Sequence, residues 1–334
     1  MTAEPDAALV FRALEPGEGA KLVDCVRRCY GDTHVDPGLY DVAAVDAALA
    51  DGSRRSAVGV TPDGEVIAHL GLVLRRPGDV TADAGLTMVD PRYRGRGLAR
   101  RLSVEVGCMA NELGLVGLHD YPVTVHAGTQ RLAKGAPVVG LLLDNMPADV
   151  DFQEMEAPET AGATASLVRY MALRPAPARV VHLPAPYVDL ARRLYEQCGL
   201  DRAVRSDTTP PAGETGFESH RHARRGVLVH AVSAGRESTS RLEEASTSEL
   251  RVTQIDLPLD GEGTPHVASR LRGAGFFFGA LLPEFRDGDV LRLQRLSRAL
   301  DPGAAPVLED HTREIADFVA ADATAVSALA APGS

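Results

Sequence analysis

The stretch at residues 89–102 constrains the fold of this 334-residue chain most strongly, because it joins a strand to a helix through a loop of unusual composition. A strand-like run at 86–89 enters a turn at Pro91, Gly95 and Gly97 follow among arginines, and a pattern with helical spacing begins at Leu98. Backbone N–H groups at the start of a helix bind anions, and each hydrogen bond to a charged group adds roughly 1.5–3 kcal/mol. The stretch therefore predicts an α/β fold in which a phosphorylated ligand lies at this loop.

The charge of the chain limits what that ligand can be. The formal net charge is −11, which opposes binding to nucleic acid or to an anionic membrane. Within this acidic chain, one short segment carries five arginines: Arg92, Arg94, Arg96, Arg100 and Arg101. The cluster favours a small anion over a polymer as the ligand. An RNA-binding Arg-Gly segment is disfavoured, because the chain contains a single copy of it. We expect no nucleic-acid partner and no membrane partner.

The cysteines give no indication of a metal site. The chain has four of them, at Cys25, Cys29, Cys108 and Cys198. Their spacing fits neither a zinc site nor a disulfide framework, so we expect no metal and reduced thiols. The first residues lack the basic and apolar regions of a signal peptide, and no apolar run approaches the roughly 18 residues of a membrane span. We therefore expect a cytoplasmic protein.

The first half of the chain alternates between strand and helix patterns. Strands are expected at 10–14, 55–60, 66–74, 82–89, 114–126, 138–143 and 166–173, and helices at 20–30, 42–49, 98–113 and 129–134. A stiff stretch at 174–178, with two prolines, then marks a boundary near residue 176. We expect one domain at 1–175 and a second at 176–334.

The second half echoes the first in the same order. The segments 123–125, 140–143 and 166–171 are matched by 252–255, 279–282 and 290–295. Further strands are expected at 180–183 and 250–257, and helices at 186–197 and 265–272. These echoes predict a diverged tandem repeat. The corresponding turn of the second copy, at 233–237, has one glycine and an acidic residue, so we expect that this copy binds no anion there.

The loop also carries a resemblance to a known family. Arg94, Gly97 and Ala99 match a pattern of Arg or Gln, two residues, Gly, one residue, and Gly or Ala, and the run Val89-Asp90-Pro91-Arg92-Tyr93 precedes it. With this pattern the first half resembles the acetyl-coenzyme A-dependent N-acetyltransferases of the GNAT superfamily. The resemblance implies two tandem GNAT-like domains, each a mixed, mostly antiparallel central sheet flanked by helices. It makes 1–175 the acetyl-coenzyme A-binding domain and 176–334 a degenerate copy without the coenzyme loop.

The resemblance also implies which residues bind the co-substrate, acetyl-coenzyme A. Backbone N–H groups of the loop would cradle the pyrophosphate, and a strand amide at Met88 or Val89 would face the thioester carbonyl. Pantetheine would run between two splayed strands, 86–89 and 121–126. The cofactor-binding residues implied in this way are Met88, Val89, Arg94, Gly95, Arg96, Gly97, Leu98 and Ala99.

Acetyl transfer to an amine also needs groups that move protons. An amine with a pKa of about 10.4 is almost entirely protonated at pH 7, so a base or a desolvated pocket must help. Asp83 and His126 are the candidate bases, ahead of His119 and Asp120, and each could instead have only a local structural role.

The acid that protonates the leaving thiolate is harder to identify. The superfamily commonly uses a tyrosine at the position where this chain has Arg131. Tyr121 is the nearest alternative acid, or the thiolate takes its proton from solvent. Because Arg131 takes the place of this tyrosine, a first half that has lost its activity is a further alternative.

The predicted function is acetyl transfer from acetyl-coenzyme A to the amine of a small molecule, for example a secondary metabolite. Direct transfer in a ternary complex is favoured, because the chain has no Ser or Cys nucleophile elbow and no metal motif. One alternative is a non-catalytic, acyl-coenzyme A-binding regulatory protein. Another is an acetyltransferase of protein lysines or N-termini, whose basic substrates an acidic surface would attract. The chain would act as a monomer or homodimer.

Overall fold

The computed structural model describes residues 9–125, 127–146, 150, 164–222, 227–236, 251–298 and 310–330. The chain divides into two compact units. Among the described residues, those up to Asp120 and Val150 belong to the first unit, and the others from Tyr121 onward belong to the second. This division does not fall near residue 176, where composition indicated a boundary, so the assignment of domains 1–175 and 176–334 stays a prediction.

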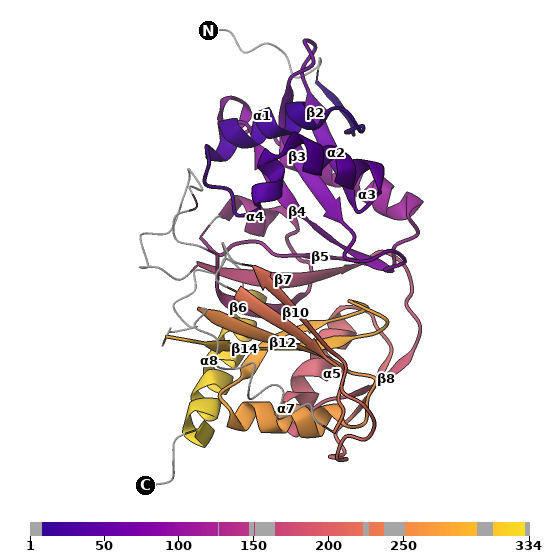
Figure 1. Ribbon diagram of the computed structural model, residues 1–334, viewed down its shortest axis with the longest axis vertical. Helices are drawn as coiled ribbons and strands as arrows, with labels where there is room; N and C mark the ends of the chain where they lie inside the picture. The colour runs from indigo at the N-terminus through magenta and orange to yellow at the C-terminus, as the bar shows by residue number, and fades with distance from the viewer. Residues whose placement is uncertain are drawn as a thin grey trace. The chain divides into compact units, whose positions relative to one another are not determined.

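The first unit is a sheet covered by helices (Figure 1). Its elements are β1 (Val10–Ala13), α1 (Gly19–Tyr30), a 3-10 turn η2 (Pro37–Tyr40), α2 (Val42–Ala50), β2 (Arg54–Val60), β3 (Val66–Val73), β4 (Thr81–Val89), a 3-10 turn η3 (Pro91–Tyr93), α3 (Leu98–Glu112) and β5 (Gly117–Asp120). The strands lie in the order β1-β2-β3-β4-β5. The first three pairs are antiparallel, whereas β4 and β5 are parallel. This confirms the predicted fold class of a mixed, mostly antiparallel sheet flanked by helices.

The helices of the first unit cover opposite faces of its sheet. Val58 and Val60 of β2 belong to one buried apolar cluster with side chains of α1 and α2. The residue between them, Gly59, is paired with Phe11 of β1. The guanidinium carbon of Arg101, on α3, lies 3.9 Å from the centroid of the Phe11 ring. Since neighbouring residues of a strand face opposite sides, α3 covers one face and α1 and α2 cover the other.

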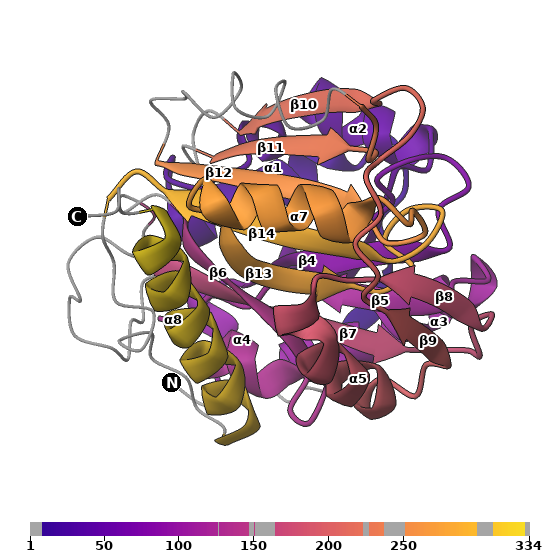
Figure 2. The same cartoon turned by 90° about the horizontal axis from the view of Figure 1, so that it is seen from below.

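The second unit has a longer sheet. Its elements are α4 (Ala127–Leu132), β6 (Val138–Met146), β7 (Thr164–Ala172), β8 (Arg179–His182), a 3-10 turn η4 (Ala185–Tyr187), α5 (Val188–Gln197), β9 (Arg202–Arg205), β10 (Phe217–His222), β11 (Val227–Val232), β12 (Val252–Pro258), α7 (Thr264–Gly273), β13 (Phe277–Leu282), β14 (Val290–Leu296) and α8 (Asp310–Ala330). The strand order is β7-β6-β13-β14-β12-β11-β10, and β8 and β9 form a separate parallel pair. Helices α5, α7 and α8 lie over one face of these strands and share their apolar cluster (Figure 2).

The second half of the chain repeats a pattern of the first half. β10 and β11 are antiparallel, as β3 and β4 are, and β11 is parallel to β12, as β4 is to β5. A helix then leads from β12 into the hairpin of β13 and β14, just as α4 precedes the hairpin of β6 and β7. This is the order expected of a diverged repeat, and the tandem assignment remains a prediction.

Some predicted elements were wrong. The strand expected at 114–126 ends at Asp120, because Pro122 has no N–H to donate; beyond it, Val123 forms only an isolated bridge to Ser166. Helix α8 and strands β9 and β10 were not predicted. For α8 a signal was present, since the buried residues Ile315, Val319 and Val326 recur at helical spacing.

The crossing of β6 and β13 inside the second unit yields a prediction for stability. A Cβ added to Gly140 would lie 2.4 Å from that of Ala280, so Gly140→Ala should lower the free energy of unfolding by about 1–3 kcal/mol. A Cβ on Gly107, in the middle of α3, would meet no atom within 4 Å, so Gly107→Ala should raise it by about 0.5–1 kcal/mol. Urea unfolding measures both changes, and effects of the same sign would contradict this packing.

Candidate functional site

The loop between β4 and α3 exposes its backbone. Gly95 and Gly97 have φ angles of 75° and 73°, in the left-handed region that favours glycine. A Cβ at either position would meet no atom within 4 Å, so the space above both glycines is open. Gly97 caps α3 without a side-chain hydrogen bond, and the N–H groups of the first helical turn have no partner within the helix. The loop can therefore bind a group that accepts hydrogen bonds from several backbone N–H groups at once.

A buried carboxylate anchors this loop. Asp90 is 1% exposed. Its Oδ1 accepts from the backbone N–H of Arg92 at 3.0 Å, and its Oδ2 accepts from Nε of Arg28, on α1, at 2.7 Å. Arg28 also donates to the carbonyl of Val66 at 2.6 Å, and Arg92 donates to Glu65 at 2.7 Å. The first turn of the loop is thus tied to both α1 and the start of β3.

These contacts determine the charge of Asp90. Burial raises the pKa of its carboxyl, but the hydrogen bonds and charges of Arg92 and Arg28 lower it more, to about 2. Asp90 is therefore ionised at neutral pH. Of the clustered arginines, Arg92 is engaged by these carboxylates and Arg101 by the ring of Phe11. Of the other arginines, Arg94 donates to the carbonyl of Val89 at 3.1 Å, the guanidinium carbon of Arg96 lies 5.1 Å from the centroid of the Tyr93 ring, and Arg100 is exposed.

Strand β4 contains a bulge just before the loop. His69 of β3 pairs with Met88, and Gly71 pairs with Gly85. One residue lies between the pairs on β3 and two lie between them on β4, so β4 has one extra residue there. Within the bulge, Leu86 has a φ of 57°. β4 pairs with β5 only over its first residues, Thr81–Ala84, which lie opposite Gly117–Asp120. The end of β4 therefore extends beyond β5.

The direction of the backbone amides follows from the pairing after the bulge. The N–H of Asp90 donates to the carbonyl of Ile67 in β3 at 2.8 Å. Because groups alternate along a regular antiparallel strand, the N–H of Met88 also faces β3 and that of Val89 faces away. Thr87 lies in the bulge, but the Leu86 carbonyl of the same peptide group is 2.8 Å from Nδ1 of His69 on β3, so the N–H of Thr87, on the opposite side of that planar group, points away as well. Of the two predicted amides, that of Val89 therefore points away from β3 and that of Met88 does not, and their role stays a prediction. The direction of the Thr87 amide depends on a bulge that the sequence pattern does not reveal.

The predicted base Asp83 lies on β4 away from this loop. Asp83 forms an ion pair with Arg75 and stands opposite His119 on β5. It precedes Val89 by six residues, which is roughly 20 Å along a strand. Tyr121 belongs to the second unit and is partly buried against its apolar cluster. His126 lies outside the described residues.

The corresponding turn of the second half is closed by its own backbone. A Cβ on Gly235 would lie 2.4 Å from the carbonyl carbon and oxygen of Glu214. On either side of it, the N–H of Ser233 donates to Gly216 at 3.1 Å and that of Arg236 to Gly213 at 3.3 Å. The described part of this turn therefore lacks the open face of the 95–97 loop.

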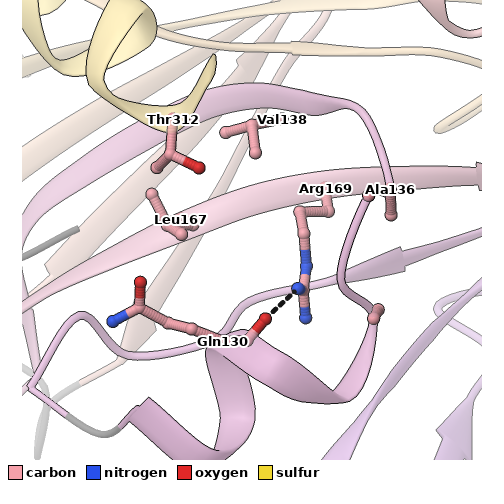
Figure 3. Close-up of a pocket in the computed structure, with 8 residues that line it drawn as sticks. Gln130, Ala136, Val138, Leu167, Arg169 and Thr312 are labelled. Carbon is pink, nitrogen blue, oxygen red and sulfur yellow. Dashed lines mark hydrogen bonds between the residues drawn. The ribbon is translucent and has the colours of Figure 1, made fainter. Parts of the chain in front are cut away.

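A small pocket in the second unit has a structural explanation (Figure 3). It is lined by Gln130, Ala133, Gly135, Ala136, Val138, Leu167, Arg169 and Thr312. Its volume of about 10 Å³ is close to what one water molecule needs. Arg169 donates to the carbonyls of Gln130 and Thr129 at 2.8 and 3.2 Å, at the C-terminal end of α4, where a cation is favoured. The pocket is too small for a coenzyme or an acceptor.

The described part of the chain contains no group of three or more His, Cys, Asp or Glu residues placed to hold a metal ion. None of its described helices is both long enough and apolar enough to cross a membrane.

Comparisons with known proteins find partial structural likeness. Neither a scan against protein-family models nor a search of curated proteins gives a match. Among solved structures, the chain is similar to a ribosomal-protein-S5-alanine acetyltransferase from Vibrio fischeri, with 11% identity, 49% of this chain and 93% of the other covered, and a TM-score of 0.39.

Two further structures give similar values. One is spermidine N-acetyltransferase from Vibrio cholerae in complex with CoA and spermine, with 16% identity, 50% and 96% coverage, and a TM-score of 0.38. The other is yncA from Salmonella typhimurium with its cofactor acetyl-CoA, with 14% identity, 51% and 96% coverage, and a TM-score of 0.40. Each likeness covers about half of this chain.

The anchor of the loop gives a prediction with a pH dependence. Asp90→Asn leaves Arg28 and Arg92 without their buried anion and should lower the free energy of unfolding at pH 7 by about 3 kcal/mol. Because the pKa of Asp90 is lowered in the folded protein, to about 2, its contribution is complete above its unfolded pKa and is lost as the pH falls towards 2. Urea unfolding of both proteins should show the difference shrinking below pH 4. A constant difference would contradict the ionised anchor.

Proposed function

We propose that the chain is a GNAT-type acyltransferase that transfers an acetyl group from acetyl-coenzyme A to an amine. The observation that carries the proposal is the open loop at Gly95 and Gly97, which leads into α3 directly after the bulged end of β4. An oligophosphate fits such a loop, because it accepts several backbone hydrogen bonds at once and its charge suits the start of a helix.

The loop residues divide the binding of the pyrophosphate between them. The N–H groups of Gly97, Leu98 and Ala99 bind the phosphate oxygens, and the glycines allow close approach. Arg94 and Arg96 supply positive charge beside the same loop. Cations near a helix start oppose the helix dipole, and a bound anion would offset this unfavourable interaction.

The acetyl group lies beyond the pyrophosphate, along β4. The N–H groups of Val89 and Thr87 face away from β3 and donate to the thioester oxygen as negative charge develops there. The amine nitrogen attacks the carbonyl carbon, the C–S bond breaks, and coenzyme A leaves as a thiolate. The proton lost by the nitrogen goes to a base, and the thiolate takes one from an acid or from solvent.

Among the predicted proton carriers, His126 is the proposed base and Tyr121 the proposed acid. Asp83 is the less favoured candidate for the base, because its carboxylate is ion-paired with Arg75 and lies on the part of β4 that pairs with β5. The proposed acceptor is a small-molecule amine that reacts in a ternary complex. The proposed coenzyme-binding domain is 1–175, and 176–334 is its degenerate copy.

Two other functions each have one supporting observation. Arg131, at the position where the superfamily commonly has a tyrosine, favours a regulatory protein that binds acyl-coenzyme A without turnover. The net charge of −11 favours a basic protein substrate, with a lysine or an N-terminus as the acceptor.

A panel of acceptors distinguishes these functions. The wild-type protein should release thiol from acetyl-coenzyme A when a small amine is added, at rates well above those with lysine-containing peptides. Release with the peptides alone would favour the protein acetyltransferase. Tight coenzyme binding with no release across the panel would favour the regulatory protein.

The loop itself gives a sharper prediction. Gly97→Val places a branched side chain at a left-handed position and blocks the approach of the pyrophosphate. Since hydrogen bonds to a charged group contribute roughly 1.5–3 kcal/mol each, losing two should weaken coenzyme A binding by about 100-fold or more. Isothermal calorimetry of the wild type should give one coenzyme A per chain.

Gly52→Val is the matched control for this variant. Gly52 has a φ of 75°, and a Cβ there would meet no atom within 4 Å, so the backbone strain is the same but the position is outside the loop. Its affinity for coenzyme A should equal that of the wild type. Equal affinities of the two variants would contradict the assignment of the loop.

A further inference from the structure

The bulge in β4 is held by a buried histidine from the neighbouring strand. His69, on β3, is 0% exposed, and its Nδ1 lies 2.8 Å from the carbonyl oxygen of Leu86. That carbonyl belongs to the residue with the left-handed backbone, at the point where the regular ladder is interrupted. The imidazole therefore satisfies a buried backbone acceptor at the bulge.

A second side chain fixes the other side of the ring. Nε2 of His69 lies 2.9 Å from Oγ of Ser56, which is on β2 and 1% exposed. The carbonyl of Leu86 can only accept, so Nδ1 carries the hydrogen, and Nε2 of a neutral ring accepts from the Ser56 hydroxyl. Burial lowers the pKa of His69 to about 4, so the ring is neutral at physiological pH.

The strands around the ring leave space for it. A Cβ on Gly71 would lie 3.3 Å from Cε1 of His69 and 3.4 Å from the carbonyl oxygen of Gly85. Gly71 is the partner of Ser56 on β2 and of Gly85 on β4. Ser56, His69 and Leu86 thus form a hydrogen-bonded line across three neighbouring strands, with Gly71 beside it.

We propose that His69, oriented by Ser56, is a positioning residue for acetyl transfer, because it holds the bulge that turns the Thr87 and Val89 amides away from β3. Register in a sheet has a period of two, so removal of one extra residue would reverse the direction of every group after it. With the bulge, β4 pairs with β3 on both sides of Leu86 and still presents these two N–H groups to the thioester. His69 touches neither the coenzyme nor the acceptor in this arrangement. The inference rests on the proposed function.

The test separates positioning from simple stability. His69→Leu removes both hydrogen bonds but retains an apolar side chain. It should lower kcat for acetyl transfer to an amine that the wild type accepts by roughly 10- to 100-fold, because small displacements of reacting groups are costly. Calorimetric affinity for coenzyme A should change less than about twofold, since the 94–99 loop keeps the Asp90 anchor.

Two further variants serve as controls. His69→Asn carries an amide nitrogen near the position of Nδ1 and should restore most of the lost kcat. Val45→Ala removes a buried side chain from α2, away from the bulge, and should lower stability to unfolding without lowering kcat.

The outcomes distinguish the inference from the proposed function. A wild type that binds no coenzyme A contradicts both, so binding is measured first. If the wild type is active and His69→Leu retains its kcat, or if His69→Asn is no better than His69→Leu, the positioning role is wrong and the proposed function stands. A loss of kcat by Val45→Ala equal to that of His69→Leu would likewise reduce His69 to a structural residue.

Discussion

The buried carboxylate of Asp90 is the interaction on which the loop depends. Two arginines converge on it, one from α1 and one from the loop, so a single anion joins a helix, the start of β3 and the first turn after β4. A buried ionised group is stable only when partners replace its hydration. The same contacts engage Arg92 and leave the backbone of the two glycines as the exposed feature. The loop is therefore anchored at its first residue and open at its tip.

Strand β4 connects this loop to the proposed chemistry. Its first half is paired on both sides, with β3 and β5, and its second half extends past the end of β5. The bulge at Leu86 lies between these halves, and His69 satisfies its carbonyl. After this change of register, one continuous stretch of chain carries two sets of backbone N–H donors. One set belongs to the end of β4 and the other to the start of α3.

Much of this arrangement could be predicted from the sequence, and the limits have identifiable causes. The helix start at Leu98 and the left-handed glycines follow from local composition, and both are present. The strand expected up to His126 was wrong because Pro122 interrupts it, a signal that the apolar alternation concealed. Closeness in sequence to the central strands is all that a linear pattern offers for identifying the base. Distance along β4 and the ion pair with Arg75 then separated Asp83 from the loop.

By itself, the sequence determined the local chemistry of this protein: a strand that ends at a proline, glycines that permit a left-handed loop, and arginines around the start of a helix. These local features depend only on residues that are neighbours in the chain, so the sequence pattern is enough to predict them. Tertiary structure decided which arginines are engaged by carboxylates, which amides of β4 face away from β3, and that His69 meets Leu86. Each of those depends on strand register and on burial, which bring together residues far apart in the chain.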